Sequence, residues 1–347
     1  MESVAELLQL EGCVLQDWRR EGSCAVLEAR WEERPGVCAA CGETKHYSHG
    51  WRKRRLAHIT LGELRCDLEL SFQRWQCCHC GKVCPPAIPW APPRSRLTEA
   101  LRRFIAWQIV KLKASVEGVA QWLQAGWHTV WRCLCLPFQG LPTEDELLHL
   151  CLDEVFFREP QQYVTVLSTA RGTVLGIAPG RGQTPSAALL AALPAEVSAN
   201  VVTLATDFNA GQRRAALDAL PIADVCADHF HLVRLIRDML RACRPRQRAA
   251  GLVAAAQLRQ LLKHREPRLV RWWLNRWEES TGPLHTLWKT VDAWQAEIEN
   301  FIQTRRSTGP AEALNRRISL LRRIAGGYTN LSNFSQRILL LNQASHH

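Results

Sequence analysis

The sequence predicts a multidomain protein with an N-terminal zinc ribbon, a helix-turn-helix, and an α/β domain interrupted by an all-helical subdomain. Three observations predict this order. Two Cys-x-x-Cys pairs lie within the first 80 residues, a proline-rich segment follows them, and short strands ending in aspartate then alternate with helices. At 347 residues, 47% of them hydrophobic, the chain is long enough for two or three domains at about 150 residues each.

The composition shifts place the predicted domains at residues 1–93, 94–140 and 141–347, with the helical insertion at about 235–306. No stretch approaches the roughly 18 consecutive apolar residues of a membrane helix. The N-terminal residues also lack the basic segment that precedes the apolar core of a secretory signal. We therefore expect a cytoplasmic protein with no membrane partner, whose 14 cysteines are free thiols or metal ligands.

Charge is distributed unevenly along the chain. Residues 1–140 hold 19 basic and 14 acidic residues, residues 141–230 hold 5 and 11, and residues 231–347 hold 20 and 8. An acidic middle between basic flanks suits a protein that binds a polyanion and gathers carboxylates for metal ions. Ordinary surface charge is the alternative that composition alone leaves open.

The cysteine pairs predict a zinc site. Cys38 and Cys41 form one knuckle, Cys77 and Cys80 the other, and a glycine follows each. A two-residue spacer lets both thiolates of a knuckle face one tetrahedral zinc ion, and glycine permits the tight turn behind them. Cys78 and Cys84 lie close enough in sequence to compete as ligands, and a thiol-rich loop without metal is the alternative.

Between the knuckles, a basic run precedes a stretch with the alternating pattern of a β-strand, residues 64–72. The basic run favours contact with phosphates, although such runs are often only solvated. Its members are Arg52, Lys53, Arg54 and Arg55. Five prolines in residues 85–93 exclude helix there and indicate a linker.

Three amphipathic segments follow the linker. The first begins near Thr98, the second has Ser115 as N-cap, and a glycine-containing turn leads to the third, residues 127–134. Two short helices joined in this way predict a helix-turn-helix, whose second helix lies in the DNA major groove. His128, Thr129 and Arg132 are then the candidates that face the groove; a plain packing unit of helices is the alternative.

The acidic middle predicts three strands that each end in an aspartate: Asp153, Asp207 and Asp228. The first strand opens an antiparallel meander of three, and the other two alternate with helices. Ligand-binding residues gather at the carboxyl ends of strands in α/β sheets, so Asp153 and Asp207 are candidates to share divalent cations. Taken singly, each aspartate is more often a turn or cap residue.

From about Leu232 to Arg306 the chain is helical and rich in arginine and tryptophan, and most of the tryptophans are expected in the core. A basic helix follows, opened by Thr308 and Pro310 and ended by Gly326 and Gly327. Either Ser307 or Thr308 can cap this helix. It carries Arg316 and Arg317 beside Glu312, which taken alone is expected only to complement the helix dipole.

These parts, in this order, resemble a bacterial insertion-sequence transposase of the DDE class, specifically the ISL3 family, over essentially the whole chain. The resemblance rests on six segments: Arg74–Gly81, Leu112–Ala120, Trp127–Trp131, Leu152–Arg158, Asp228–Val233 and Gly309–Arg316. The last two are the most specific. Within 206–209 the sequence Thr-Asp-Phe-Asn lacks the tyrosine associated with this segment in relatives.

The resemblance implies a ribonuclease-H-like catalytic domain in which Asp153, Asp207 and Glu312 hold two magnesium ions. Two metal ions about 4 Å apart neutralise the attacking and leaving oxygens of a phosphodiester. The implied function is binding of the terminal inverted repeats, cleavage, and joining of the 3′-hydroxyl to target DNA, by a nucleoid-associated homo-oligomer. Asp228 is a lower-ranked acidic candidate. The alternatives are a zinc-containing DNA-binding repressor without catalysis, and a nuclease that hydrolyses without joining.

Overall fold

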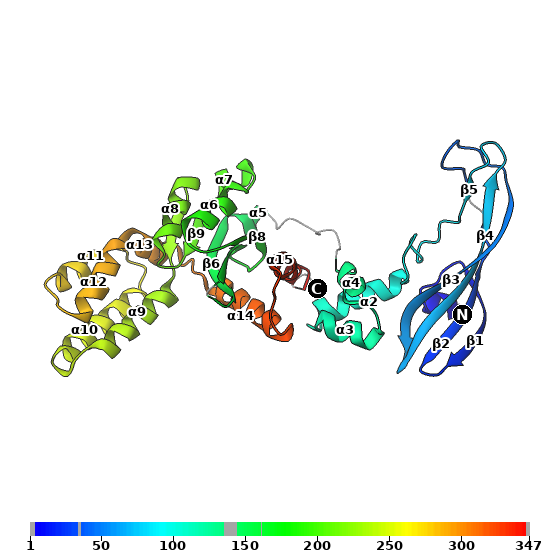
Figure 1. Cartoon of the computed structure of the whole chain (residues 1–347). Coiled ribbons are helices and arrows are strands. Elements are labelled where there is room, and N and C mark those ends of the chain that lie inside the picture. Colours follow the sequence, from blue (N-terminus) through cyan, green and yellow to red (C-terminus); the bar gives the residue numbers. More distant parts are fainter. Residues whose placement is uncertain (1–3, 34–35, 135–143, 161, 345–347) are drawn as a thin grey trace. The chain divides into compact units, whose positions relative to one another are not determined.

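The computed structural model describes residues 4–33, 36–134, 144–160 and 162–344. They divide into two compact units, residues 1–137 and 138–347 (Figure 1), and each unit is described by itself. The predicted boundary at residues 140 and 141 lies outside the described residues. None of the helices described is both long and apolar enough to span a bilayer.

A five-stranded sheet forms the first unit, in the order β1-β2-β4-β3 with β5 paired to β4. Strands β2 and β4 are parallel and the other pairs antiparallel. The alternating stretch predicted as a strand lies in β4, whose inward residues Cys66, Leu68 and Leu70 are buried. The elements are α1 (Val4–Leu7), β1 (Cys13–Glu21), β2 (Cys24–Trp31), β3 (His46–Leu61), β4 (Leu64–Cys77) and β5 (Val83–Cys84).

Three helices complete the first unit: α2 (Glu99–Val110), α3 (Val116–Leu123) and α4 (Trp127–Arg132). Both predicted caps are present. The Thr98 hydroxyl accepts from the Leu101 N–H at 3.3 Å, and the Ser115 hydroxyl accepts from the Gly118 N–H at 2.9 Å. These bonds satisfy amide groups that a helix start leaves without partners, which explains why the helices begin there.

The second unit contains a five-stranded sheet in the order β10-β9-β6-β7-β8. β6–β7–β8 is the predicted antiparallel meander, and β9 and β10 run parallel to β6. Its strands are β6 (His149–Arg158), β7 (Gln162–Thr169), β8 (Val174–Pro179), β9 (Thr203–Thr206) and β10 (Asp224–Ala227). With three antiparallel strands followed by two parallel ones, this domain is ribonuclease-H-like.

Helices cover both faces of this sheet (Figure 1). On one face, Leu150 and Leu152 of β6 pack with residues of α6 and α8. On the other, Val155 and Phe157 pack against Leu314 and neighbouring residues of the C-terminal helices. Apart from the insertion, the helices are α5 (Glu144–Leu147), α6 (Gln183–Ala191), α7 (Ala195–Asn200), α8 (Ala210–Ala219), α14 (Gly309–Ile324), α15 (Leu331–Leu339) and α16 (Leu341–Ala344).

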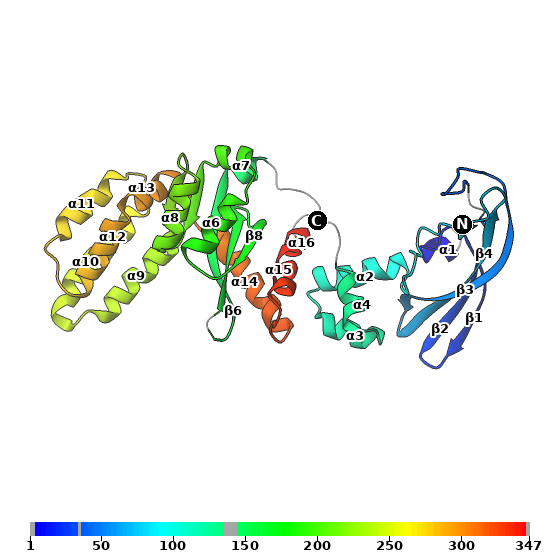
Figure 2. The same cartoon turned by 45° about the horizontal axis from the view of Figure 1, so that its top comes forward.

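Five helices form a bundle between β10 and α14, as predicted (Figure 2). They are α9 (His229–Ala242), α10 (Pro245–Leu261), α11 (Arg268–Trp277), α12 (Pro283–Ala293) and α13 (Gln295–Thr304). Trp273 and Trp294 are buried in the bundle core, and Trp277 and Trp288 pack against it. Trp272 is exposed. The expectation that most of the tryptophans serve the core is confirmed.

Candidate active site and zinc site

The sheet register places three aspartates in one row. Leu152 of β6 pairs with Thr206 of β9, and Ala227 of β10 pairs with the same Thr206. Asp153 is the next residue of β6, and Asp207 and Asp228 directly follow β9 and β10. Neighbouring strands lie about 4.8 Å apart, so side chains at matching positions are close. The predicted gathering of the aspartates is present, and Asp207 and Asp228 follow their strands as expected. The expectation that the first strand ends at Asp153 is wrong, because residues after Asp153 continue to pair with β7 and β6 runs on to Arg158.

His231 lies within hydrogen-bond distance of two of these aspartates, Asp207 and Asp228. Asp228 caps α9, its carboxylate accepting from the Phe230 and His231 N–H groups. One helical turn places the His231 ring back over the cap, where Nδ1 lies 2.7 Å from Asp228 Oδ2 and 2.9 Å from Asp207 Oδ1. The three side chains offer ligand atoms within 4.8 Å of one another.

The environment shifts the protonation of this row. Burial, and then the negative charge of Asp207, raise the pKa of Asp153 to about 7. Hydrogen bonds to Asp207 and Asp228 raise the pKa of His231 to about 10. Burial opposes ionisation of Asp228, but bonds from His231 and Thr308 outweigh it and hold its pKa below the usual value. The metal-free row therefore relies on one imidazolium to balance several carboxylates.

Side chains of α14 and of the residue just before it also contact this row; they follow the five-helix bundle in the sequence. Asn315 donates through Nδ2 to Asp153 Oδ2, and Thr308, just before the helix, bonds to Asp228. Glu312 lies one turn before Asn315, on the same side of the helix. Its side chain is half exposed, and its Oε1 accepts from Arg316 Nη2 at 2.9 Å.

The side chains fit a divalent cation. Asp207 Oδ1 is buried and has to share the single Nδ1–H of His231, 2.9 Å away, with Asp228 Oδ2, which lies closer at 2.7 Å. Such an atom is costly to bury unless a cation completes its coordination. Carboxylate oxygens are the ligands that magnesium prefers, and the crowding that raises the Asp153 pKa is what a bound cation relieves. Asp153 and Asp207 are the residues of the predicted set that the described structure brings together. Glu312 lies on α14 one turn before Asn315, which bonds Asp153, but its own side chain pairs with Arg316.

Sequence reasoning missed His231 and Asn315. The only signal for His231 was its spacing, three residues after the Asp228 cap, which returns a side chain to the helix start. Asn315 follows Glu312 by three residues, so it shares the helix side on which that glutamate was expected. The roles of the two residues could not be predicted from their residue types, because they depend on how α9 and α14 pack against the sheet.

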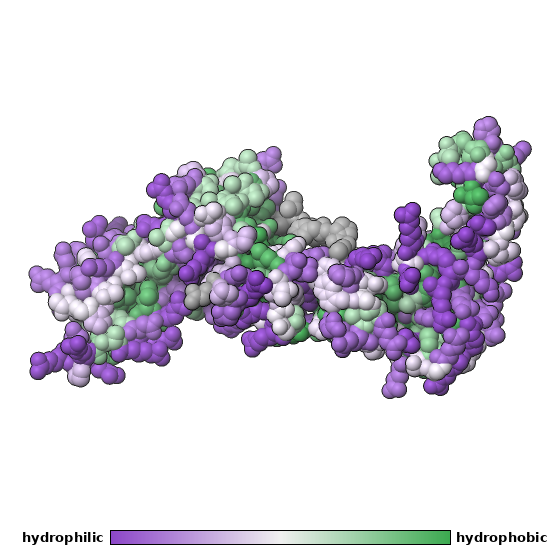
Figure 3. Space-filling view, in the orientation of Figure 1, coloured by the Kyte–Doolittle hydropathy of each residue, from purple (hydrophilic) through white to green (hydrophobic). Residues whose placement is uncertain are grey.

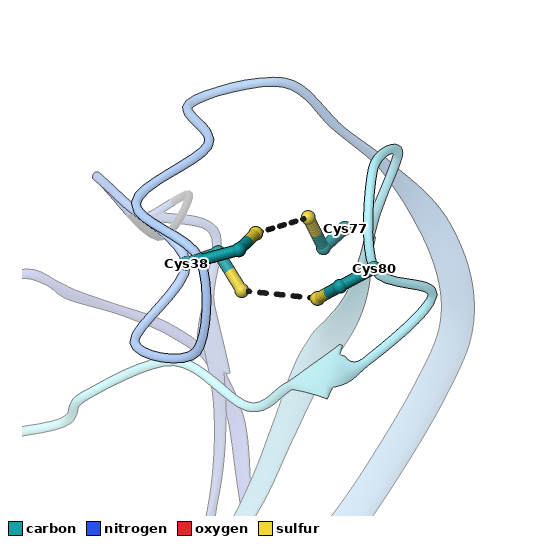
Figure 4. A group of neighbouring side chains, drawn as sticks. Cys38, Cys77 and Cys80 are labelled. Atoms are coloured by element: carbon teal, nitrogen blue, oxygen red, sulfur yellow. Dashed lines mark hydrogen bonds between the residues drawn. The ribbon is translucent and has the colours of Figure 1, made fainter.

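The four predicted cysteines form one group in the first unit (Figure 4). The Sγ atoms of Cys38 and Cys80 lie 3.6 Å apart, and those of Cys41 and Cys77 lie 3.5 Å apart. Four sulfurs about 2.3 Å from a tetrahedral zinc ion are about 3.8 Å from one another, so these separations suit zinc. Backbone amides of Ala40 and Cys41 lower the pKa of Cys38 to about 6, which favours the thiolate that binds metal.

The glycines behind the knuckles adopt the expected turns. Gly42 and Gly81 have φ values of +74° and +68°, and their N–H groups donate to the Cys38 and Cys77 carbonyls. Cys78 lies outside the group, whereas Cys84 Sγ is 3.9 Å from Cys38 Sγ. The end of this unit that carries β5 shows as a hydrophobic patch in Figure 3.

The four basic residues between the knuckles lie in different surroundings on β3. Arg52 and Lys53 are exposed. Arg54 donates to the carbonyls of Ala91, Pro92 and Ser95, and so holds the proline-rich segment. Arg55 pairs with Asp67 at 2.7 Å and with Glu21 at 3.1 Å. Of the four candidates for DNA contact, the last two are engaged within the protein.

On α4, His128 and Arg132 are exposed and Thr129 is half-buried. On α14, Arg316 pairs with Glu312, and Arg317 donates to the Leu341 carbonyl at 3.1 Å. The α14 arginines therefore have partners within their own unit, while the α4 residues keep the accessibility that their predicted role requires.

Comparison with known families covers most of the chain. Residues 34–80 match "zinc-finger of transposase IS204/IS1001/IS1096/IS1165", and residues 86–134 match "Helix-turn-helix domain of transposase family ISL3". Residues 150–266 and 252–338, together more than half of the chain, match the ISL3 family model for DDE enzymes, described as "Transposase". The chain belongs to the ISL3 family of transposases. The family and the domain order expected from the sequence are confirmed.

This ISL3 family member is similar to curated transposases. The transposase for insertion sequence element IS1001 of Bordetella parapertussis is 25% identical over 237 residues, covering 63% of this chain and 57% of that protein. The transposase for IS1557 of Mycobacterium tuberculosis (strain ATCC 25618 / H37Rv) is 25% identical over 221 residues, covering 61% and 49%. The chain thus spans about half the length of the curated relatives it matches.

Among solved structures, a chain titled "Drosophila P element transposase strand transfer complex" has a TM-score of 0.26 and 12% identity. The match covers 71% of this chain and 78% of that one.

Proposed function

We propose that this ISL3 family member is a DNA transposase that binds the terminal inverted repeats of its insertion sequence and carries out metal-dependent cleavage and strand transfer. The observation that supports this most is the meeting of three chain segments at one row of aspartates on the sheet. Asp153 of β6, Asp207 after β9 and the start of α14 come together although the five-helix insertion separates the last from the others.

In this proposal Asp153, Asp207 and Glu312 hold two magnesium ions, with Asp228 as a further acidic group. The ions would supply stabilisation of charge on the attacking and leaving oxygens of the phosphodiester. Asn315 orients the Asp153 carboxylate through its hydrogen bond. His231 holds the Asp228 and Asp207 carboxylates in one orientation. Glu312 takes part once its side chain leaves Arg316.

The two N-terminal modules bind the DNA. Arg52 and Lys53 of β3 contact phosphates, and α4 enters the major groove with His128, Thr129 and Arg132. The cysteine group keeps its end of the sheet folded around zinc. We propose that the protein acts on DNA as a homo-oligomer associated with the nucleoid.

One observation favours a second candidate, a zinc-containing DNA-binding protein without catalysis. Glu312 pairs with Arg316, and the metal-competent group in the described part of the second unit contains neither Glu312 nor Asp153. In that case the protein recognises the repeats and represses without cutting them.

One experiment separates the candidates. The full chain is incubated with linear DNA that carries the element's flanking repeats, with magnesium or with EDTA. We expect magnesium-dependent nicking at the repeat boundary and joined products with target DNA. Specific binding without nicking would support the second candidate, and nicking without joined products would identify a nuclease.

The matched variants are Asp153→Asn and Asp224→Asn. Asp224 is an exposed carboxylate at the start of β10, away from the row. We expect Asp153→Asn to abolish nicking and to leave repeat binding within about twofold, and Asp224→Asn to change neither. Cleavage by Asp153→Asn at the wild-type rate would show that the metal site is assigned wrongly.

A further inference from the structure

A basic pocket lies in the first unit beside α4. Its volume is about 480 Å³, and it is formed by the segment that leads into α2 together with one side of α4. Four arginines line it: Arg94, Arg96, Arg102 and Arg132. Among the described residues that line it, none is acidic.

Three of these positive charges lack a counter-charge. Arg102 pairs with Glu99 at 2.8 Å. Arg94, Arg96 and Arg132 are exposed, and none of them forms an ion pair within the described part of the chain. Guanidinium groups gathered in one concavity repel one another unless an anion binds among them. The pocket is therefore suited to a bound anion.

The segment that carries Arg94 and Arg96 is held in a defined shape. Arg94 has φ +60°, a left-handed conformation that side chains other than glycine seldom adopt. Arg54 of β3 donates to the carbonyls on both sides of it, 3.0 Å from Pro92 O and 2.7 Å from Ser95 O. The Ser95 hydroxyl also accepts from the Leu97 N–H at 3.0 Å. A backbone conformation of this kind persists only where its surroundings impose it, which is typical of binding sites.

We propose that this pocket binds a backbone phosphate of the DNA whose major groove receives α4. Arg94 and Arg96 are the new contacts, and Arg132 joins them from the end of the helix. The planar guanidinium fork matches the oxygens of a phosphate, and the Thr129 hydroxyl on the same wall supplies a further donor. Phosphate contacts on either side of the groove fix the register of a recognition helix.

This inference rests on the proposed function, in which the helix-turn-helix binds DNA. It adds a role for Arg94 and Arg96, which directly follow the predicted linker 85–93 and were not among the candidates for DNA contact. It also gives Arg54 the task of positioning that segment rather than touching DNA.

The test measures binding of the full chain to a duplex with the terminal repeat, and to an unrelated duplex of equal length, between 50 and 200 mM salt. The variants are Arg94→Gln/Arg96→Gln, the charge-retaining pair Arg94→Lys/Arg96→Lys, and the control pair Arg20→Gln/Arg65→Gln. The control residues lie near the Gly22 turn, at one end of the sheet. Zinc content and circular dichroism verify that each variant is folded.

Each phosphate contact contributes about 0.9 to the slope of log K against log salt. We expect the glutamine pair to reduce the slope by about one to two and to weaken binding to both duplexes by a similar factor, roughly tenfold or more at 100 mM salt. The lysine pair retains most of the slope, and the control pair behaves like the wild type.

Three results would overturn the inference while leaving the proposed function standing. They are a glutamine pair with the slope of the control pair, a lysine pair as weak as the glutamine pair, or a loss confined to the repeat duplex. An unchanged slope would mean that Arg94 and Arg96 do not contact phosphate. A weak lysine pair would indicate a structural role for these arginines, and a loss confined to the repeat duplex would indicate that they contact bases. A wild-type protein that binds neither duplex would instead refute the proposed function itself, and this inference with it.

Discussion

At the scale of single residues, the most informative group is Asp153. Its folded-state pKa of about 7 lies above the value of 3.8 for a free aspartate, because the carboxyl is buried beside Asp207. The folded protein therefore binds this proton more tightly than the unfolded chain does. The resulting loss of stability begins as the pH rises above about 4 and is complete above about 7.

The loss of stability on ionisation of Asp153 leads to a prediction for the protein without added metal. Asp153→Asn removes the charge and keeps one of the two oxygens that accept from Asn315 and from the Glu154 N–H, so on balance it should stabilise the second unit at pH 8. We expect a gain on the order of 2 kcal/mol, since one pKa unit corresponds to about 1.4 kcal/mol and part of the effect relaxes. Thermal unfolding without added magnesium measures it, with zinc retained. The gain should shrink toward pH 4, and a pH-independent gain would mean that Asp153 is not the group responsible.

Residue identity alone did not determine the roles of the basic run. Successive side chains on a strand point to opposite faces, so Arg52 and Arg54 share one side of β3 and Lys53 and Arg55 the other. Arg55 meets acidic residues of neighbouring strands, and Arg54 meets the returning proline-rich segment. The partners of Arg54 and Arg55 depend on the strand register, and a run of four basic residues does not specify that register.

At the scale of elements, local chemistry predicted several boundaries. Caps at Thr98 and Ser115, alternation in β4, and aspartates after β9 and β10 all follow from short-range rules. The β1–β2 hairpin, by contrast, was not described from the sequence. Its parallel pairing with β4 joins segments about 40 residues apart, and nothing in either segment specifies that partner.

The cysteine knuckles give an element-scale prediction. Cys38→Ser removes one of four ligands and should lower the zinc content of the purified protein and weaken repeat binding. Cys78→Ser is the matched control, because Cys78 lies within the second knuckle but outside the cysteine group. Elemental analysis and a binding titration check both. Equal zinc content in the two variants would contradict the assignment.

A second element-scale prediction concerns the proline-rich segment. Arg54→Met leaves three carbonyls without their donor and should destabilise the first unit by about 1–3 kcal/mol. Arg52→Met, two residues earlier and exposed, should have little effect. Urea denaturation measures the difference; equal midpoints for the two variants would mean that the segment does not depend on Arg54.

At the scale of the whole molecule, each of the two compact units has its own core. The first unit packs around Leu56, Leu68 and Leu70, and the second around its sheet and the helical bundle. Domains with separate cores often unfold in separate steps. The domain order was predictable because each domain carries its own short motifs. The contacts of Asn315 and Thr308 with the row of aspartates cross the insertion, and local patterns do not encode them.

Calorimetry should therefore show two unfolding transitions. We expect removal of zinc by a chelator to lower the transition of the first unit and to leave that of the second within about 1 °C, because the cysteine group lies entirely in the first unit. Asp153→Asn should shift only the other transition. A single transition that responds to both changes would show that the units unfold together.

The helical insertion also sets the order in which a newly made chain becomes complete. The ribosome releases the cysteine knuckles and α4 first, and Thr308 and Asn315 emerge only after all five helices of the bundle. A message cut short within the bundle would yield a polypeptide with its whole N-terminal unit and an unfinished second one. If the N-terminal unit binds the repeats, such fragments would occupy them without being able to cut, and would restrain the intact protein made from the same message.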